Sequence, residues 1–210
     1  NERDVLENKV KFYEVYQPFI KHAYCSLEDL KSNTDNAQNV LGNQTGKMVV
    51  KDALGQCGFE VEILSTSDYS RETLIEHMEN RGFNLLEAFV QQHSRLQALS
   101  PTGLNTIRFI TMINSAGEVD VLGARLRISV NSHVDNLASG NIAAPIDLET
   151  GIVNGSAVYS DITKDSVDVH PVTGVPIVGF KIPFWKEIVE ESEKIALYQP
   201  QNRGVGWDVA

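Results

Sequence analysis

Two strand-like segments joined by a short turn constrain the fold more than any other feature of the chain. "TIRFITMI" (106–113) and "EVDVLGARLRISV" (118–130) flank the turn sequence "NSAG", a pattern that predicts an antiparallel hairpin. The second segment places alternate apolar residues on one face, which we expect to be buried: Leu122, Ala124, Leu126, Ile128 and Val130. Gly123, Arg125 and Arg127 lie on the other face.

The arginines of this hairpin allow two interpretations. Arg108 falls on the same face as Arg125 if the turn has an even number of residues, whereas a turn of odd length would separate them. Adjacent guanidinium groups repel each other unless an anion or carboxylates lie between them, and arginine binds phosphate and carboxylate through paired hydrogen bonds. The pair therefore marks either an anion site or two surface arginines paired with Asp or Glu, and spacing alone favours the second.

Helices and strands alternate along the rest of the chain. Helices are expected over 4–22, over 71–81 with Ser70 as N-cap and Gly82 as the stop, and over "FWKEIVEESEKIALYQ" between Pro183 and Pro200. Strands are expected at 47–51, 59–64 and 84–90, a loop at 32–46, and short strands with long loops over 131–180. Helices interspersed with antiparallel strand pairs predict the α+β class.

Lysine and glycine residues surround the first predicted strand pair. Lys51 closes the apolar run "MVV", and Gly55 and Gly58 follow in the turn "DALGQCG". This stretch is either a plain hairpin with a solvated lysine or a strand-turn-strand flap whose backbone N–H groups approach a phosphate. A P-loop and a dinucleotide fingerprint are both absent from the sequence.

Composition excludes several classes of protein. The formal net charge of -10 argues against a general nucleic-acid binder, although a local basic pocket remains compatible with it. Cys25 and Cys57 give no disulfide framework, which favours a reducing compartment. No apolar run is long enough for a membrane span, and no signal peptide is visible.

Two further stretches contain polar residues that are candidates for metal binding or for lining the site. Asp208 lies inside the apolar run "GWDVA", where a carboxylate is costly unless it is paired or binds a metal, so it is a Mg²⁺ ligand candidate. The loop "SHVDN" (132–136) follows the arginine strand and is expected to line the same site. The histidines have no ligand spacing that would indicate zinc.

The order of these motifs resembles the sugar-transfer-associated ATP-grasp family. The motifs are "NK" on an early helix, "MVVKDALGQCG", "LLEAFVQQHSRLQALSPTGLNTIRFIT", "ARLRIS" with a later "VDN", "IDLETG", "HPVTG", "IPFWKEI" and "GWDVA", spread over residues 5–210. The resemblance implies an ATP-grasp fold, with two α+β lobes and a nucleotide cleft between them. The N-lobe would span 1–90 with a phosphate flap at 47–64, and the C-lobe would span 91–210.

Site residues follow from the same resemblance. It implies a nucleotide-binding set in which the two lysines and the flap contact phosphate, while the glutamate and two backbone positions read adenine: Lys9, Lys51, Gly55, Gly58, Glu87, Phe89 and Val90. Arg108 and Arg125 are implied as catalytic arginines that face phosphate or an acyl-phosphate, and Asp208 as the first Mg²⁺ carboxylate. Lys51→Ala is expected to weaken ATP binding with little loss of stability.

The implied activity is Mg²⁺-dependent ligation of a carboxylate to an amine or a thiol through an acyl-phosphate, linked to polysaccharide biosynthesis. Alternatives are a regulatory nucleotide-binding module, phosphoryl transfer to a sugar, and an α+β binding protein without nucleotide. Partners would be a small carboxylate or sugar-linked substrate in the cytoplasm, without nucleic acid or membrane insertion and with a possible homodimer.

The sequence also departs from the family pattern. The flap has few glycines, "SGN" stands where a Gly-Gly pair is expected, and the Glu-x-Asn strand expected after "GWDVA" is not present. We therefore expect a truncated ATP-grasp core that does not turn over ATP alone.

Overall fold

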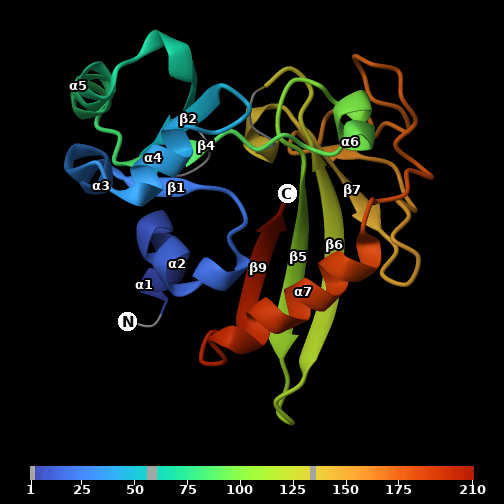
Figure 1. Ribbon diagram of the computed structural model, residues 1–210. Helices are drawn as coiled ribbons and strands as arrows, with labels where there is room; N and C mark the ends of the chain where they lie inside the picture. The colour runs from blue at the N-terminus through green and yellow to red at the C-terminus, as the bar shows by residue number, and fades with distance from the viewer. Residues whose placement is uncertain (1–2, 56–60, 133–135) are drawn as a thin grey trace. The chain divides into compact units, whose positions relative to one another are not determined.

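A computed structural model describes residues 3–55, 61–132 and 136–210. The chain divides into two compact units, Asn1–Gln91 and Gln92–Ala210, each built from helices and an antiparallel sheet (Figure 1). The expected α+β class is therefore confirmed. Among the described helices, none is long and apolar enough to cross a membrane.

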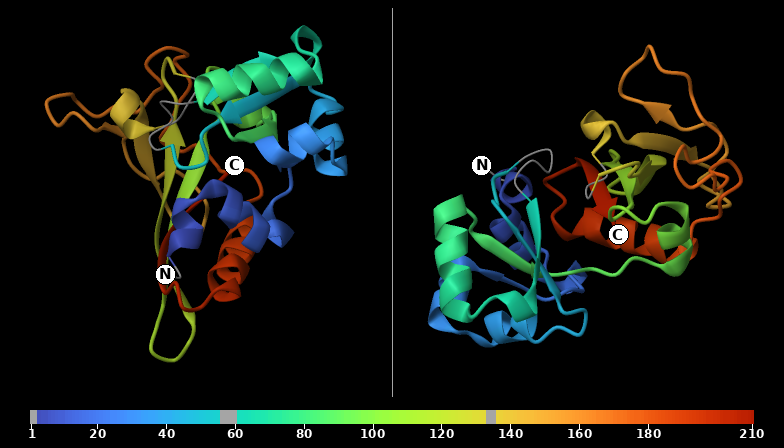
Figure 2. Two further views of the ribbon diagram at one scale, coloured as in Figure 1. Left: turned by 90° about the vertical axis from the view of Figure 1, so that its left-hand side faces the viewer. Right: turned by 90° about the horizontal axis from the view of Figure 1, so that it is seen from above.

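The first unit contains a four-stranded antiparallel sheet of order β1-β4-β2-β3. Its strands are β1 (Tyr24–Ser26), β2 (Lys47–Lys51), β3 (Val61–Ser65) and β4 (Leu85–Ala88). Alternate strand residues face a core that also includes side chains of α3 (Leu27–Ser32), α4 (Asp35–Leu41) and α5 (Arg71–Arg81). Figure 2 shows α5 lying along one side of this sheet. Lys51 and Glu87 lie on the opposite face of the sheet, which does not face this core.

Capping residues define α5 as the sequence predicts. The Ser70 hydroxyl accepts a hydrogen bond from the backbone N–H of Thr73, and the Thr73 hydroxyl accepts one from the backbone N–H of Ser70. Gly82 ends the helix in the left-handed conformation with φ +73°.

The segment 32–46 is not the continuous loop that its composition predicts, because α4 occupies Asp35–Leu41. Thr34 caps this helix by accepting from the N–H of Ala37 at 3.4 Å. Ala37 and Val40 are fully buried and lie three residues apart on one helix face. Burial of this face stabilises a helix that the asparagines alone would not favour.

The helix expected over 4–22 is divided into α1 (Asp4–Glu7), α2 (Lys9–Val15) and the 3-10 turn η1 (Gln17–Phe19). Asn8 interrupts the helix with extended dihedral angles, φ -106° and ψ 114°, and its side chain accepts from the N–H groups of Val10 and Lys11. An asparagine that caps the following turn competes with the continuous helix, and this competition explains the break.

The second unit contains a five-stranded antiparallel sheet of order β8-β7-β6-β5-β9. Its strands are β5 (Thr106–Ile113), β6 (Val119–Ile128), β7 (Ile142–Ile146), β8 (Val158–Tyr159) and β9 (Gly204–Val209). The remaining helices and 3-10 turns of the described residues are η2 (Thr66–Asp68) in the first unit and α6 (Ser94–Leu99), η3 (Leu137–Ser139) and α7 (Trp185–Tyr198) in the second.

Helix α7 crosses one face of β5, β6 and β9, as Figure 1 shows. The rings of Phe109 and Trp185 stack there with centroids 5.2 Å apart. Gly151, with φ +68°, leaves the room that Trp185 occupies, because a Cβ at this position would lie 2.3 Å from its Cγ. The other face of the sheet carries Arg108 and is not covered by α7.

The hairpin β5–β6 is confirmed, but its turn has an odd number of residues (114–118) between the paired Ile113 and Val119. A β-bulge between Ile110 and Thr111 shifts the register by one residue and places Arg108 directly opposite Arg125. Leu122 is the extra residue of the bulge and is 60% exposed, so its assignment to the core was wrong.

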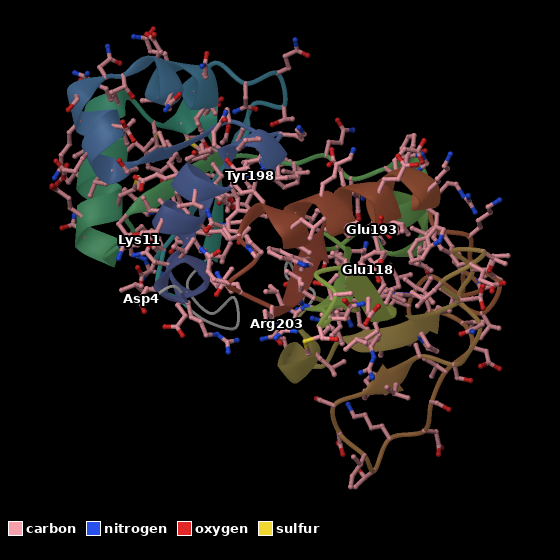
Figure 3. All side chains as sticks on the ribbon, turned by 90° about the horizontal axis from the view of Figure 1, so that it is seen from below. Asp4, Lys11, Glu118, Glu193, Tyr198 and Arg203 are labelled. Carbon is pink, nitrogen blue, oxygen red and sulfur yellow. The ribbon has the colours of Figure 1, made fainter. Side chains whose placement is uncertain are left out.

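The turn end of this hairpin bonds to Arg203, the residue immediately before β9. The Arg203 guanidinium donates to the carbonyl of Ile113 from Nε at 3.0 Å and from Nη2 at 2.8 Å. Asn114 organises the turn by accepting from the N–H groups of Ala116 and Glu118. Figure 3 labels Arg203 and Glu118 at this end of the sheet.

Candidate functional site

A charged cluster in the first unit is centred on Glu87 of β4, whose side chain is 9% exposed. Glu87 Oε1 accepts a hydrogen bond from the Tyr13 hydroxyl at 2.6 Å and lies 2.6 Å from Lys51 Nζ. The Lys51 Nζ also lies 5.9 Å from the centroid of the Tyr13 ring. Antiparallel pairing of β2 with β4 puts Lys51 opposite Leu85, so Glu87 is its diagonal neighbour on the same sheet face.

Lys51 is not the solvated lysine of a plain hairpin. Its side chain is 15% exposed and forms an ion pair with a carboxylate that is more buried still. Such a pair costs desolvation of both charges, and a fold seldom needs it for stability alone. The ion pair argues against the expectation that Lys51→Ala costs little stability, because the substitution would leave the Glu87 carboxylate buried without its cation, and we therefore predict a loss of stability.

Titration of the groups around Glu87 is strongly perturbed. Burial raises the pKa of the Tyr13 phenol far above its ordinary value, and the negative charge of Glu87 raises it further. Burial lowers the pKa of His22, and the neighbouring Lys51 charge lowers it as well, against the opposing effect of Glu87. Tyr13 is therefore a neutral hydrogen-bond donor, and His22 is held in its neutral form near pH 7.

The turn after Lys51 is fixed by Lys9, the first residue of α2. Lys9 Nζ donates to the carbonyl of Gly55 at 2.5 Å, and the Lys9 backbone N–H donates to the carbonyl of Ala53 at 3.1 Å. Asn84 holds the same turn by accepting from the N–H of Ala53 and donating to Asp52. The structure thus brings the predicted residues Lys9, Gly55 and Lys51 into one region of the first unit, whereas Gly58 lies outside the described residues.

The two residues after β4, Phe89 and Val90, differ in whether their backbone groups are already hydrogen-bonded. The N–H of Phe89 donates to the carbonyl of Lys47 at 3.2 Å, and Lys47 Nζ lies 5.4 Å from the Phe89 ring centroid. Val90 forms no hydrogen bond with any residue that the structure describes. Of the two backbone positions implied for adenine, Val90 keeps both its N–H and its carbonyl available, whereas the Phe89 N–H is already used.

A second charged cluster lies on the open face of the sheet in the second unit. Asp208 of β9 lies opposite Arg108 of β5 and accepts two hydrogen bonds from it, one from Nε and one from Nη2 at 2.7 Å. Arg127 of β6 donates from Nη1 to Asp208 Oδ2 at 3.0 Å. The interpretation as arginines paired with a carboxylate therefore holds for Arg108.

Arg125 differs from these two arginines. It lies opposite Arg108 and is exposed, and its side chain forms no hydrogen bond or ion pair with a described residue. Its guanidinium group is therefore available to bind an anion on the same face that carries Asp208.

Gly206 of β9 shapes this cluster from beside Arg108. A Cβ at Gly206 would lie 3.2 Å from Arg108 Cδ and 3.5 Å from its Nη1. The absence of a side chain thus permits Arg108 to lie along β9 and reach Asp208 two residues further along the strand.

The carboxylates of the described residues decide how a Mg²⁺ ion could be held. Within residues 3–55, 61–132 and 136–210, no group of three or more His, Cys, Asp or Glu side chains could hold a metal ion. Mg²⁺ in phosphate-transfer sites is commonly bound by one or two carboxylates, with phosphate and water completing the shell. Asp208, with its side chain 41% exposed, fits the role of one such ligand if it releases a guanidinium partner.

Two other predictions of the sequence concern the "SHVDN" loop and the cysteines. His133 and Asp135 of the loop lie outside the described residues, so its expected place at the site stays a prediction. Cys25 is free and buried, and burial with the nearby Asp29 charge raises the pKa of its thiol to about 12. The thiol is therefore unreactive at neutral pH.

Sequence reasoning missed two residues of the clusters. Tyr13 lies four residues after Lys9 on α2, and this helical spacing is the one signal that could have grouped them. Arg127 was placed on the correct face of β6 but was not assigned to the site. Its partner Asp208 comes from a distant strand, and only strand order brings the two together.

Comparison with known proteins places the chain in a family. No curated protein matches the sequence. Among solved structures, the chain is similar to the biotin carboxylase domain dimer of Hydrogenobacter thermophilus 2-oxoglutarate carboxylase in complex with MgADP, ADP and bicarbonate. That similarity has 19% sequence identity and a TM-score of 0.39, and it covers 59% of this chain and 26% of that chain. The family model described as sugar-transfer associated ATP-grasp matches residues 1–210, and the chain therefore belongs to the sugar-transfer-associated ATP-grasp family.

Proposed function

We propose that this chain binds ATP with Mg²⁺ and that the protein uses ATP to activate a carboxylate for ligation. The observation that carries the proposal is the ion pair of Lys51 and Glu87. A lysine with 15% exposure next to a carboxylate with 9% exposure, on the sheet face that the core does not use, is costly unless it serves a ligand.

Residues of the first unit would bind the nucleotide. Lys51 and Lys9 carry the positive charges for phosphate oxygens, and Gly55 belongs to the turn that Lys9 holds. We also assign Gly58, which belongs to the same predicted flap, to the residues that contact phosphate. Glu87 would orient Lys51 and bind adenine together with the backbone of Phe89 and Val90.

Residues of the second unit would stabilise the transferring phosphoryl group. Arg125 supplies an available guanidinium group, and Arg108 supplies a second one next to it. Asp208 would hold Mg²⁺, which when bound neutralises charge on phosphate oxygens. In the absence of an anion, Asp208 keeps the repulsion between Arg108 and Arg127 low by binding both.

The proposed reaction has two bond exchanges. A substrate carboxylate oxygen forms a bond to the γ-phosphorus of ATP while the bond to the bridging oxygen breaks and ADP leaves. An amine or thiol then forms a bond to the acyl carbon, inorganic phosphate leaves, and a proton is released to solvent. The lysine and arginine side chains would position the reacting groups and stabilise the charge on the transferring phosphoryl group. These two effects supply much of the rate in such transfers.

The substrate would be a small carboxylate or a sugar-linked compound of polysaccharide biosynthesis, as the family description suggests. A cytoplasmic location belongs to the same proposal, because ATP is available there and Cys25 is a free thiol.

Nucleotide binding can be tested with a pair of double variants. Lys51→Met/Glu87→Gln removes both charges of the buried pair and leaves no unpaired charge, so the fold should persist. Calorimetric titration with MgATP should show an affinity at least about tenfold lower than for the unchanged chain, equivalent to about 1.4 kcal/mol. Lys31→Met/Glu79→Gln removes an exposed pair of 3.0 Å in the same unit and should leave the affinity unchanged.

Two results would contradict the binding proposal. One is a chain that binds no MgATP at millimolar concentration, and the other is an equal loss of affinity in both double variants.

Carboxylate activation has its own readout. In the full-length protein, hydroxylamine should trap an activated carboxylate as a hydroxamate in amounts that depend on ATP. Formation of ADP with a phosphosugar would favour phosphoryl transfer instead, and nucleotide binding without any product would favour a regulatory module.

A further inference from the structure

The carboxylate of Asp208 is bound by arginines in the way that a phosphate is bound. Strands β6, β5 and β9 lie side by side, and Arg125, Arg108 and Asp208 form one row across them (Figure 1). Asp208 accepts two hydrogen bonds from Arg108 and a third from Arg127 at 3.0 Å. One carboxylate of the chain thus binds two guanidinium groups, which are the donors that proteins use for phosphate.

Both of these guanidinium groups are held toward β9. The Arg108 side chain lies over Gly206, since its Cδ and Nη1 are 3.2 Å and 3.5 Å from the position of a Cβ there. Arg127 belongs to β6, so its side chain crosses β5 to reach Asp208. The Arg125 side chain, by contrast, bonds to no described residue. Asp208 therefore determines where two of the three arginines on this face point.

Positive charge exceeds negative charge at this end of the sheet. Three arginines share one face with a single carboxylate, that of Asp208, in the paired rows of β5, β6 and β9. The residues of β7 opposite the two arginines of β6 are uncharged: Pro145 and Ala143. Positive charge therefore remains after Asp208 has bound its partners, and it attracts an anion to this face.

We propose that Asp208 blocks the arginine site until a ligand with a phosphate group displaces it. This inference rests on the proposed function, in which Asp208 binds Mg²⁺. The pair of Arg108 and Asp208 is exposed, and exposed ion pairs contribute little to stability. A phosphate group with about two negative charges therefore competes well with one carboxylate. The displaced carboxylate becomes available to Mg²⁺, so that anion binding and Mg²⁺ binding are coupled through one side chain.

Removal of the carboxylate should have opposite effects on two forms of an inorganic probe, pyrophosphate. Asp208→Asn removes the charge that competes for the arginines, so metal-free pyrophosphate should bind this variant about three- to tenfold more tightly. The same substitution removes a Mg²⁺ ligand, so Mg²⁺ should strengthen pyrophosphate binding to the unchanged chain and not to the variant. A merely structural role of Asp208 predicts no such reversal.

NMR of arginine side chains reports binding in the second unit alone. The Nε–H signals of Arg108 and Arg125 are followed while pyrophosphate is added, first without and then with Mg²⁺. In the unchanged chain the Arg108 signal should shift, because its Nε–H exchanges the Asp208 carboxylate for phosphate. Arg203 is the internal control, since its Nε–H donates to the carbonyl of Ile113 at 3.0 Å and its signal should stay in place.

Asp120→Asn is the matched control variant, because it removes the same charge from the same sheet face. Asp120 lies opposite Met112 and accepts a hydrogen bond from Asn114 at 3.3 Å. Met112 is four residues from Arg108 on β5, about 13 Å along the strand, which exceeds the screening length of about 8 Å at physiological salt. Asp120→Asn should therefore bind metal-free pyrophosphate within about twofold of the unchanged chain.

The inference is overturned if Asp208→Asn does not gain affinity for metal-free pyrophosphate, or if Asp120→Asn gains as much. It is also overturned if Mg²⁺ strengthens binding to Asp208→Asn as much as to the unchanged chain. The unchanged chain gives a test that does not depend on the folding of a variant, since a shift of Arg125 without a shift of Arg108 would mean that Asp208 is not displaced.

The same titration separates this inference from the proposed function. If neither arginine signal responds to pyrophosphate, with or without Mg²⁺, the phosphate role of Arg108 and Arg125 fails together with the inference. If both signals respond and Asp208→Asn gains no affinity, the inference alone fails.

Discussion

Lys51 and Glu87, on neighbouring antiparallel strands, form an ion pair of 2.6 Å in which neither side chain is more than 15% exposed. Both charges are therefore largely buried, and the Tyr13 hydroxyl donates a hydrogen bond to the same carboxylate. Removal of one partner therefore has consequences for stability as well as for binding.

Lys51→Ala should lower the free energy of unfolding by about 3 kcal/mol, because it leaves a buried carboxylate without its cation. Urea denaturation followed by circular dichroism measures the loss. Lys31→Ala, which removes a lysine from exposed carboxylates, should cost much less than Lys51→Ala, because solvent screens exposed ion pairs. Equal losses in the two variants would show that Glu87 does not depend on Lys51.

Arg125→Gln and Arg127→Gln should separate an available arginine from a structural one. The Arg125 side chain is exposed and bonds to no described residue, so its replacement should change the unfolding free energy by less than about 0.5 kcal/mol. Arg127, with its side chain 17% exposed, donates to Asp208 at 3.0 Å, and its replacement should cost about 1–2 kcal/mol. A larger loss for Arg125→Gln than for Arg127→Gln would contradict the assignment.

Gly206→Ala should disturb the pair of Arg108 and Asp208. The added Cβ would lie 3.2 Å from Arg108 Cδ and displace the guanidinium from the carboxylate. Gly123→Ala is the matched control, since Gly123 also lies opposite Ile110 and a Cβ there meets nothing within 4 Å. Gly206→Ala should be about 1 kcal/mol less stable than Gly123→Ala by thermal unfolding, and equal stability would mean that Arg108 needs no such room.

His22 should make the chain less stable in mild acid. Its pKa in the folded chain is lowered below the ordinary 6.5, so the unfolded chain binds the proton more readily. The contribution to stability is fully present above about pH 6.5 and is lost as the pH falls through the folded-state pKa. Denaturation series between about pH 5 and 7 should show a smaller loss of stability for His22→Gln than for the unchanged chain, and parallel curves would exclude His22 as the cause.

Gly151→Ala should destabilise the second unit more than a backbone effect alone explains. Its Cβ would lie 2.3 Å from Trp185 Cγ at a φ of +68°. Gly174→Ala has a similar φ of +71° with nothing within 4 Å and should cost about 1 kcal/mol, the penalty of the left-handed conformation. Gly151→Ala should cost at least about 2 kcal/mol more in thermal unfolding, because Trp185 must move from its stack on Phe109.

Local signals in the sequence determined several elements of this protein. Ser70 and Gly82 define α5 because capping depends on atoms within a few residues, and alternation predicts the hairpin of β5 and β6 because side chains of a strand alternate between faces. The same order of motifs identified the family, which the match over residues 1–210 confirms.

Tertiary structure decided what local signals could not. The odd turn 114–118 alone would separate Arg108 from Arg125, and the bulge at Leu122 restores their pairing, since a register depends on the whole ladder and not on the turn. The burial of Lys51 depends on Glu87 and Tyr13, which lie far from it in sequence, and the partner of Arg127 comes from the last strand of the chain. A charge's environment is set by the segments that fold around it, so the roles of these residues became visible only in three dimensions.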